Sequence, residues 1–118
     1  MSGVVIVVVD DMFFASKIRA VAEAVDVPIS FPRSKEALLE KAHEARLILV
    51  DLHNQKIDAL VLARELKADE RLRAIPVVGF FSHVETELQR NALAAGFDQV
   101  LPRSAFSRDL PKILSQSD

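Results

Sequence analysis

The stretch VVIVVVDD, residues 4–11, decides the fold that this sequence predicts. Its first six residues are all β-branched and apolar, which is the pattern of a strand buried on both faces of a sheet. Two adjacent aspartates, Asp10 and Asp11, end the run. Strands buried on both faces belong to sheets that helices cover from both sides, so we expect strands and helices to alternate along the chain.

The rest of the sequence continues this alternation. The expected strands are Val4–Val9, Val27–Phe31, Leu47–Leu52, Pro76–Phe81 and Gln99–Leu101. Pro28 suits an edge position for the second of them. The expected helices are Ala15–Val25, one capped by Ser34, one from Asp58 through Lys67, one opened by the capping box Ser82-His83-Val84-Glu85 and ended by Gly96, and a short last one with Leu110, Ile113 and Leu114. Five strands alternating with five helices predict a parallel α/β sheet covered on both faces.

Length and composition restrict the classes of function. With 118 residues, we expect one domain over residues 1–118. There is no cysteine, which excludes disulfides and thiolate metal sites. The apolar run near the N-terminus is too short to span a bilayer and lacks the features of a signal peptide, so we expect a cytoplasmic protein with no membrane partner. The net charge is −2 and the basic residues are scattered, which argues against nucleic-acid binding.

Polar side chains follow the expected strands at the point where each one ends. They are Asp10 and Asp11, then Asp51, then Ser82, then Arg103. Because the carboxyl ends of parallel strands meet at one edge of the sheet, we expect these residues to converge. Three neighbouring carboxylates repel one another unless a cation relieves them, and Mg²⁺ prefers such oxygen ligands. A carboxylate can also attack phosphorus as a nucleophile and form an acyl phosphate.

The sequence resembles the receiver domains of response regulators in two-component signalling, over essentially its whole length. The residues that carry the resemblance are Val9-Asp10-Asp11, Leu47-Ile48-Leu49-Val50-Asp51, Asp58, Pro76-Val77-Val78 and Gly96-Phe97-Asp98. The resemblance implies the flavodoxin-like, doubly wound fold with strand order 2-1-3-4-5 and five helices. It also implies a phosphorelay role, with Asp51 as the phosphoacceptor.

The same resemblance implies a metal site and a set of partners. Mg²⁺ would be held by the carboxylates of Asp11 and Asp51 and the main-chain carbonyl of His53, with Asp10 assisting through water. The phosphoryl donor would be a sensor histidine kinase or a phosphotransfer protein, and a downstream protein partner would read the signal. Homodimer formation is left open.

Several positions depart from the receiver pattern. Phe81 stands at the position of the switch hydroxyl, with Ser82 one residue late, and Arg103 replaces the lysine that follows the fifth strand. The other departures are Gln55 and Ser104 for prolines, Ala59 for glycine and Val100 for an aromatic residue. The acid cluster and scaffold are therefore retained, while the residues that would read a phosphoryl group are altered.

Two functions remain open at this point. The first is a single-domain receiver that accepts phosphate on Asp51, and the second is a degenerate receiver that binds partners without phosphorylation. Met12-Phe13-Phe14 bears on the second, because helical geometry makes it hard to bury both phenylalanines and an exposed one would suit a partner surface. Simpler structural roles also stay open: Asp10 and Asp11 as acids at a helix N-terminus, and Ser82 as a helix N-cap. We expect no independent enzyme activity, since no general base or substrate pocket can be named.

Overall fold

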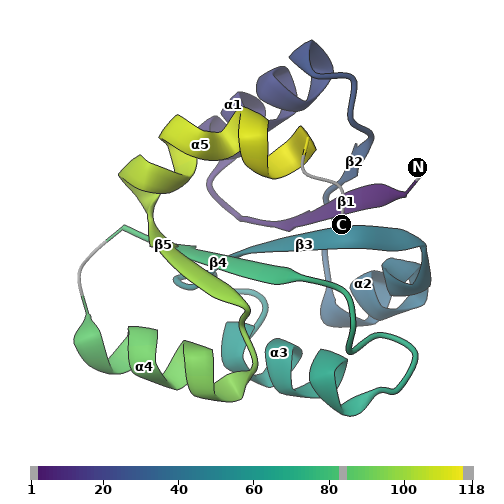
Figure 1. Cartoon of the computed structure of the whole chain (residues 1–118), viewed down its shortest axis with the longest axis vertical. Coiled ribbons are helices and arrows are strands. Elements are labelled where there is room, and N and C mark those ends of the chain that lie inside the picture. The colour runs from purple at the N-terminus through teal and green to yellow at the C-terminus, as the bar shows by residue number, and fades with distance from the viewer. Residues whose placement is uncertain (1–2, 83–84, 116–118) are drawn as a thin grey trace.

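The structure, a computed structural model, describes residues 3–82 and 85–115. Strands and helices alternate along the chain (Figure 1). The strands are β1 (Val4–Val8), β2 (Ile29–Ser30), β3 (Ala45–Asp51), β4 (Val77–Phe81) and β5 (Gln99–Pro102). The helices are α1 (Met12–Ala24), α2 (Lys35–Lys41), α3 (Ala59–Ala68), α4 (Thr86–Ala95) and α5 (Arg103–Ser115), and a 3₁₀ turn, η1 (Ala42–Glu44), follows α2.

The strands form one parallel sheet in the order β2-β1-β3-β4-β5, which confirms the predicted fold class and the edge position of the second strand. The apolar β1 and β3 lie side by side in the centre, with Val8 level with Val50. One residue later Asp51 lies level with Phe80 of β4. The register therefore brings the acidic end of β1 next to the end of β3.

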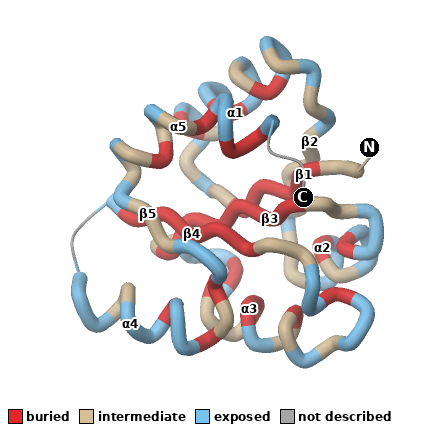
Figure 2. Tube along the Cα trace, in the orientation of Figure 1, coloured by how far each residue is buried: buried red, intermediate tan, exposed pale blue. Residues whose placement is uncertain are grey.

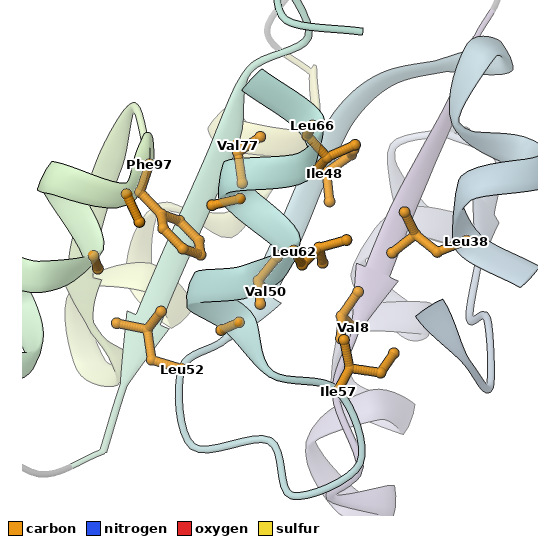
Figure 3. Close-up of a cluster of buried hydrophobic side chains, with 14 of the residues drawn as sticks. Val8, Leu38, Ile48, Val50, Leu52, Ile57, Leu62, Leu66, Val77 and Phe97 are labelled. Carbon is orange, nitrogen blue, oxygen red and sulfur yellow. The ribbon is translucent and has the colours of Figure 1, made fainter. Parts of the chain in front are cut away.

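Helices cover both faces of the sheet, as Figure 1 shows: α1 and α5 on one face, α2, α3 and α4 on the other. The buried residues concentrate in the central strands (Figure 2). Figure 3 shows the cluster beneath α2 and α3, to which β1 and β3 contribute Val8, Ile48 and Val50. None of the helices that the structure describes is long and apolar enough to cross a membrane.

Two helices begin earlier than the sequence predicted. α1 begins at Met12 and not at Ala15, because the side chain of Asp11 caps the first turn. α5 begins at Arg103 and runs to Ser115, although Pro111 inside it cannot donate a main-chain hydrogen bond. The apolar spacing marked only the buried stripe of this helix and not its polar first turn. The predicted caps Ser34 and Asp58 are both confirmed.

The capping box proposed for the fourth helix is wrong. α4 begins at Thr86, its N-cap residue is Glu85, and Ser82 is not part of the helix. Because β4 runs to Phe81, the chain first needs a few residues to cross from the sheet to the helix layer, and this need overrides the local capping signal. His83 and Val84 lie outside the described residues. The predicted end at Gly96 is confirmed by its φ of +122°.

Candidate functional site

Asp51 is a buried carboxylate at the end of the central strand β3. Only 7 % of the residue is exposed, and it is the one buried polar or charged residue in the part of the chain that the structure describes. Its Oδ1 accepts a hydrogen bond from the His53 amide at 2.9 Å. Burial raises the pKa of Asp51, and the nearby charge of Asp10 adds to that rise, while the His53 amide and the charge of Arg103 oppose it. Asp51 is therefore a poorly hydrated carboxylate that interacts with the negative charge of Asp10 and the positive charge of Arg103.

Asp11 is engaged at both of its carboxylate oxygens. Oδ1 accepts from the amides of Phe13 at 3.0 Å and Phe14 at 3.1 Å, which makes Asp11 the N-cap of α1. Oδ2 accepts from Nη2 of Arg103 at 3.1 Å. The Phe14 amide and the Arg103 guanidinium hold the pKa of Asp11 below its usual range. The interpretation of Asp11 as a helix N-terminal acid is therefore confirmed.

Arg103 is fixed between Asp11 and an aromatic ring. Its Cζ lies 3.9 Å from the centroid of Phe14, a cation–π arrangement. Phe14 belongs to an aromatic cluster with Phe80 and Phe106, with ring centroids 5.3 Å from Phe80 and 5.9 Å from Phe106. The rings of Phe80 and Phe106 stack at 4.3 Å. This aromatic cluster gives the guanidinium a rigid support that sequence reasoning missed, although the apolar spacing of Phe14 and Ile18 on one helix could have indicated it.

Asp10 is exposed and joins β1 to the loop that follows Asp51. Its Oδ2 accepts from the amide of Gln55 at 3.2 Å. In the same loop, Nδ1 of His53 lies 3.9 Å from Oε2 of Glu85, just before α4. The loop after β3 therefore contacts the residue that follows β1 and the residue that precedes α4, both at the carboxyl edge of the sheet.

The predicted residues for reading a phosphoryl group lie in different environments. Phe81 is 5 % exposed and packs in the cluster between the sheet and the helices α3 and α4. Ser82, one residue later, is exposed. Val100 is half-buried against the same cluster as Phe81. Phe81 therefore serves the core where the receiver pattern has a hydroxyl.

Asp11, one of the predicted metal ligands, is already engaged by other groups of the chain. Among residues 3–82 and 85–115, no three His, Cys, Asp or Glu side chains are grouped so that they could hold a metal ion. At Asp11, Oδ1 accepts from two amides and Oδ2 accepts from Arg103. A divalent ion at Asp11 would compete with the guanidinium for this carboxylate.

Exposed apolar side chains flank the acidic edge. Phe13 is 92 % exposed and Met12 is 78 % exposed, both in the first turn of α1, while Phe14 is buried at 7 %. The prediction that only one of the two phenylalanines would be buried is confirmed. Met12 also lines a hollow of about 440 Å³ beside Asp10. An apolar surface therefore adjoins the acids.

The fold, a parallel sheet in this order with acidic residues at the ends of β1 and β3, is similar to that of solved response-regulator receiver domains. The chain superposes on the chemotaxis response regulator CheY4 of Vibrio cholerae with a TM-score of 0.79 and 16 % identity, covering 97 % of each chain. The receiver domain of a sensor histidine kinase from Pseudomonas aeruginosa, with a magnesium ion coordinated in its active site cleft, gives 0.76 and 20 %, covering 98 % of this chain and 100 % of that one.

A third similar structure is the phosphorylated form of a cyanobacterial phytochrome response regulator, RcpA, with a TM-score of 0.78 and 19 % identity. The match covers 97 % of this chain and 89 % of that one. No protein-family model matches the sequence, and no curated protein matches it significantly. At these identities the comparisons establish the receiver fold.

Proposed function

We propose that this chain is a receiver module of two-component signalling in which Asp51 accepts a phosphoryl group. The observation that carries the proposal is the buried carboxylate at the end of β3, next to the acidic end of β1. A carboxylate that is desolvated and hydrogen-bonded at one oxygen keeps the other oxygen for nucleophilic attack. We propose no catalytic activity beyond this transfer.

The transfer is a displacement at phosphorus. A carboxylate oxygen of Asp51 attacks the phosphorus of the donor, and an acyl phosphate forms. In a phosphohistidine donor the P–N bond breaks, and the electron pair leaves on the imidazole nitrogen, which then takes a proton. Arg103 lies close enough to lower the pKa of Asp51 electrostatically, so its positive charge also favours the added negative charge of a phosphoryl group.

Magnesium and the partners stay predictions within this proposal. Two-component receivers with bound metal and bound phosphate are among the solved structures that this chain resembles. A kinase or phosphotransfer protein would be the donor. Mg²⁺ held by Asp10, Asp11, Asp51 and the His53 main-chain carbonyl would supply positive charge for the transferred group. The Asp11–Arg103 ion pair stands against such a site, so no step of the transfer is assigned to the metal.

The test is phosphorylation by a small donor. Incubation with excess acetyl phosphate, with and without Mg²⁺, should add the mass of one phosphoryl group to the intact protein, measured by mass spectrometry. Asp51→Asn should remove the addition. Asp58→Asn is the matched control, since Asp58 is an exposed helix cap and asparagine caps equally well. No added mass with either acetyl phosphate or a phosphohistidine protein would contradict the proposal.

A second candidate function is partner binding that does not depend on phosphorylation. It is favoured by the 92 % exposure of Phe13 beside the acidic edge and by the buried Phe81 at the hydroxyl position. Exposed aromatic side chains are enriched in the centres of protein interfaces. In this case the fold would be retained as a scaffold and Asp51 would not need to react.

The two candidates differ in which variant loses binding. Under the second candidate, the proteins retained by the immobilised chain should be the same for the wild type and Asp51→Asn, and should be lost for Phe13→Asp. Phe13 is almost fully exposed, so this substitution should leave the unfolding midpoint nearly unchanged. If Asp51→Asn alone removes the bound proteins, phosphorylation-independent binding is excluded.

A further inference from the structure

The ion pair between Asp11 and Arg103 occupies the place where a receiver would need a free acid. Nη2 of Arg103 lies 3.1 Å from Oδ2 of Asp11, and the two side chains are 31 % and 39 % exposed. An isolated pair with this exposure has little strength, because water competes for both charges. This pair is held from both sides, however, since the Asp11 carboxylate is anchored by two amides and the guanidinium lies on the ring of Phe14.

The aromatic cluster fixes the position of the guanidinium. Phe14 is buried and contacts Phe80 and Phe106, so the ring beneath Arg103 cannot turn away without disturbing the core. The Nε of Arg103 is buried and has no hydrogen-bond partner among the described residues. Packing on the ring, together with one charged hydrogen bond to Asp11, therefore positions this side chain. A planar, always charged group suits this arrangement better than lysine would.

A divalent ion and this guanidinium compete for the Asp11 carboxylate. Oδ1 of Asp11 caps α1, and Arg103 donates to Oδ2, the oxygen that does not cap the helix. They also repel: Coulomb's law in a water-like dielectric gives on the order of tenfold in affinity for one unit charge about 5 Å from a divalent ion. The second predicted ligand, Asp51, is buried and feels the same positive charge.

We propose that Arg103 is the resident cation of this acidic site, where it neutralises Asp11 and keeps divalent ions from binding tightly. The inference rests on the proposed function, since it concerns the site that would hold the phosphoryl group. It goes further in making Arg103 a positioning and selectivity residue: its guanidinium is held against Asp11 by the ring of Phe14. The wild-type protein then binds Mg²⁺ weakly, and loss of Arg103 creates a site.

The experiment is a metal titration of the unphosphorylated protein. Mn²⁺ binding is followed by electron paramagnetic resonance of the free ion, and Mg²⁺ binding is followed by competition against Mn²⁺. Arg103→Gln should bind Mn²⁺ about tenfold more tightly than the wild type, from the Coulomb estimate above. Asp11→Asn in the Arg103→Gln background should return the affinity to the wild-type level.

The matched control is Arg108→Gln on the same helix. Arg108 is 72 % exposed, pairs with Asp109, and its replacement changes the net charge by the same amount. Arg108→Gln should leave the Mn²⁺ affinity unchanged. A gain equal to that of Arg103→Gln would show a general charge effect and overturn the proposal. Equal affinities of the wild type and Arg103→Gln would overturn it too, as would a gain that survives Asp11→Asn.

A second variant protects the test against a folding defect. Arg103→Lys keeps the charge but loses the planar stack on Phe14, so a gain of a few-fold is expected from it. No gain in either Arg103 variant overturns the proposal. Because the readout needs no phosphoryl donor, its failure is distinguishable from failure of the proposed function: the latter would appear as unphosphorylated Asp51 whatever the metal affinities are.

Discussion

Replacing Asp51 with asparagine should stabilise the fold at neutral pH. The folded protein buries this carboxylate, leaving 7 % of the residue exposed, and gives it one hydrogen bond, from the His53 amide at 2.9 Å. Asparagine can accept the same hydrogen bond through its side-chain oxygen and has no charge to desolvate. A buried polar group with incomplete hydrogen bonding costs roughly 1–3 kcal/mol, and a buried charge costs more.

The size of this stabilisation follows from the opposing effects that act on the charged form of Asp51. Burial is the largest influence on the pKa of Asp51, and the opposing effects of the His53 amide and Arg103 are smaller, so the net effect of folding on the charged form is unfavourable. Each unit of pKa difference between the folded and unfolded states is worth about 1.4 kcal/mol. The new amide group of asparagine also needs a partner, which offsets part of the gain. We expect a net stabilisation on the order of 1 kcal/mol, or about 4 °C in Tm for a chain of this size.

The stability advantage of Asp51→Asn depends on pH, and its direction follows from the raised pKa of Asp51. Because the pKa of Asp51 is raised in the folded state, the folded protein keeps a proton that the unfolded chain has already released. The stability that this proton contributes is full below the unfolded pKa and is lost as the pH rises through the folded pKa. The advantage of Asp51→Asn should therefore be absent in acid and grow as the pH rises through this window to neutrality.

The assay is urea unfolding of both proteins from acidic to neutral pH, in a buffer with a chelator so that no metal contributes. Asp58→Asn serves again as the control, because it removes one charge from an exposed cap and should change stability little at any pH. The reasoning is refuted if Asp51→Asn is less stable than the wild type at pH 7. It is also refuted if the difference between the two proteins is the same at every pH.

Three further predictions concern the scaffold around the site. Phe14→Ala should lower the free energy of unfolding by about 3–5 kcal/mol, because Phe14 is only 7 % exposed and its ring belongs to the aromatic cluster. Phe13→Ala should change the free energy of unfolding by about 0.5 kcal/mol or less. Equal effects of the two substitutions in urea unfolding would contradict this prediction. Gly79→Ala should lower the free energy of unfolding by about 1–3 kcal/mol, because Gly79 lies on the fully buried strand β4 and an added Cβ would be 2.9 Å from the ring of Phe97. An unchanged Tm in calorimetry would contradict this prediction. Lys67→Met should lower the free energy of unfolding by about 1–3 kcal/mol and speed amide hydrogen exchange in the segment after α3. The reason is that Nζ of Lys67 donates to two main-chain carbonyls at 3.0 Å and to a carboxylate at 2.9 Å. Exchange protection equal to that of the wild type would count against this prediction.

The sheet could be predicted from the sequence because its strands carry a strong, local signal. Runs such as Val4–Val9 and Leu47–Val50 are apolar without interruption, and such runs are typical of strands covered on both faces. The ends of the helices were harder to predict. Asp11 was recognised as a helix N-terminal acid but not as the cap of α1, and the signal at Ser82 was a false one because β4 ends directly before it.

The composition of the site could be predicted, but its pairings could not. Alternation placed Asp10, Asp11, Asp51 and Arg103 at one edge, since parallel strands all end there. Which acid meets the guanidinium depends on the angle at which α1 and α5 leave the sheet and on the ring of Phe14 between them. Such a contact joins residues separated by 92 positions, and neither residue carries a local pattern that indicates the other.

The acids of this site are therefore not equivalent, and the difference between two of them constrains function. Asp11 is half-exposed, accepts hydrogen bonds at both carboxylate oxygens and has a lowered pKa, so it serves the structure as the cap of α1. Asp51 is buried, has a raised pKa and keeps an oxygen outside the hydrogen bond from His53, so it is the carboxylate that can react. Arg103 contributes to this difference between the two acids, because it donates a hydrogen bond to Asp11 but acts on Asp51 only through its charge.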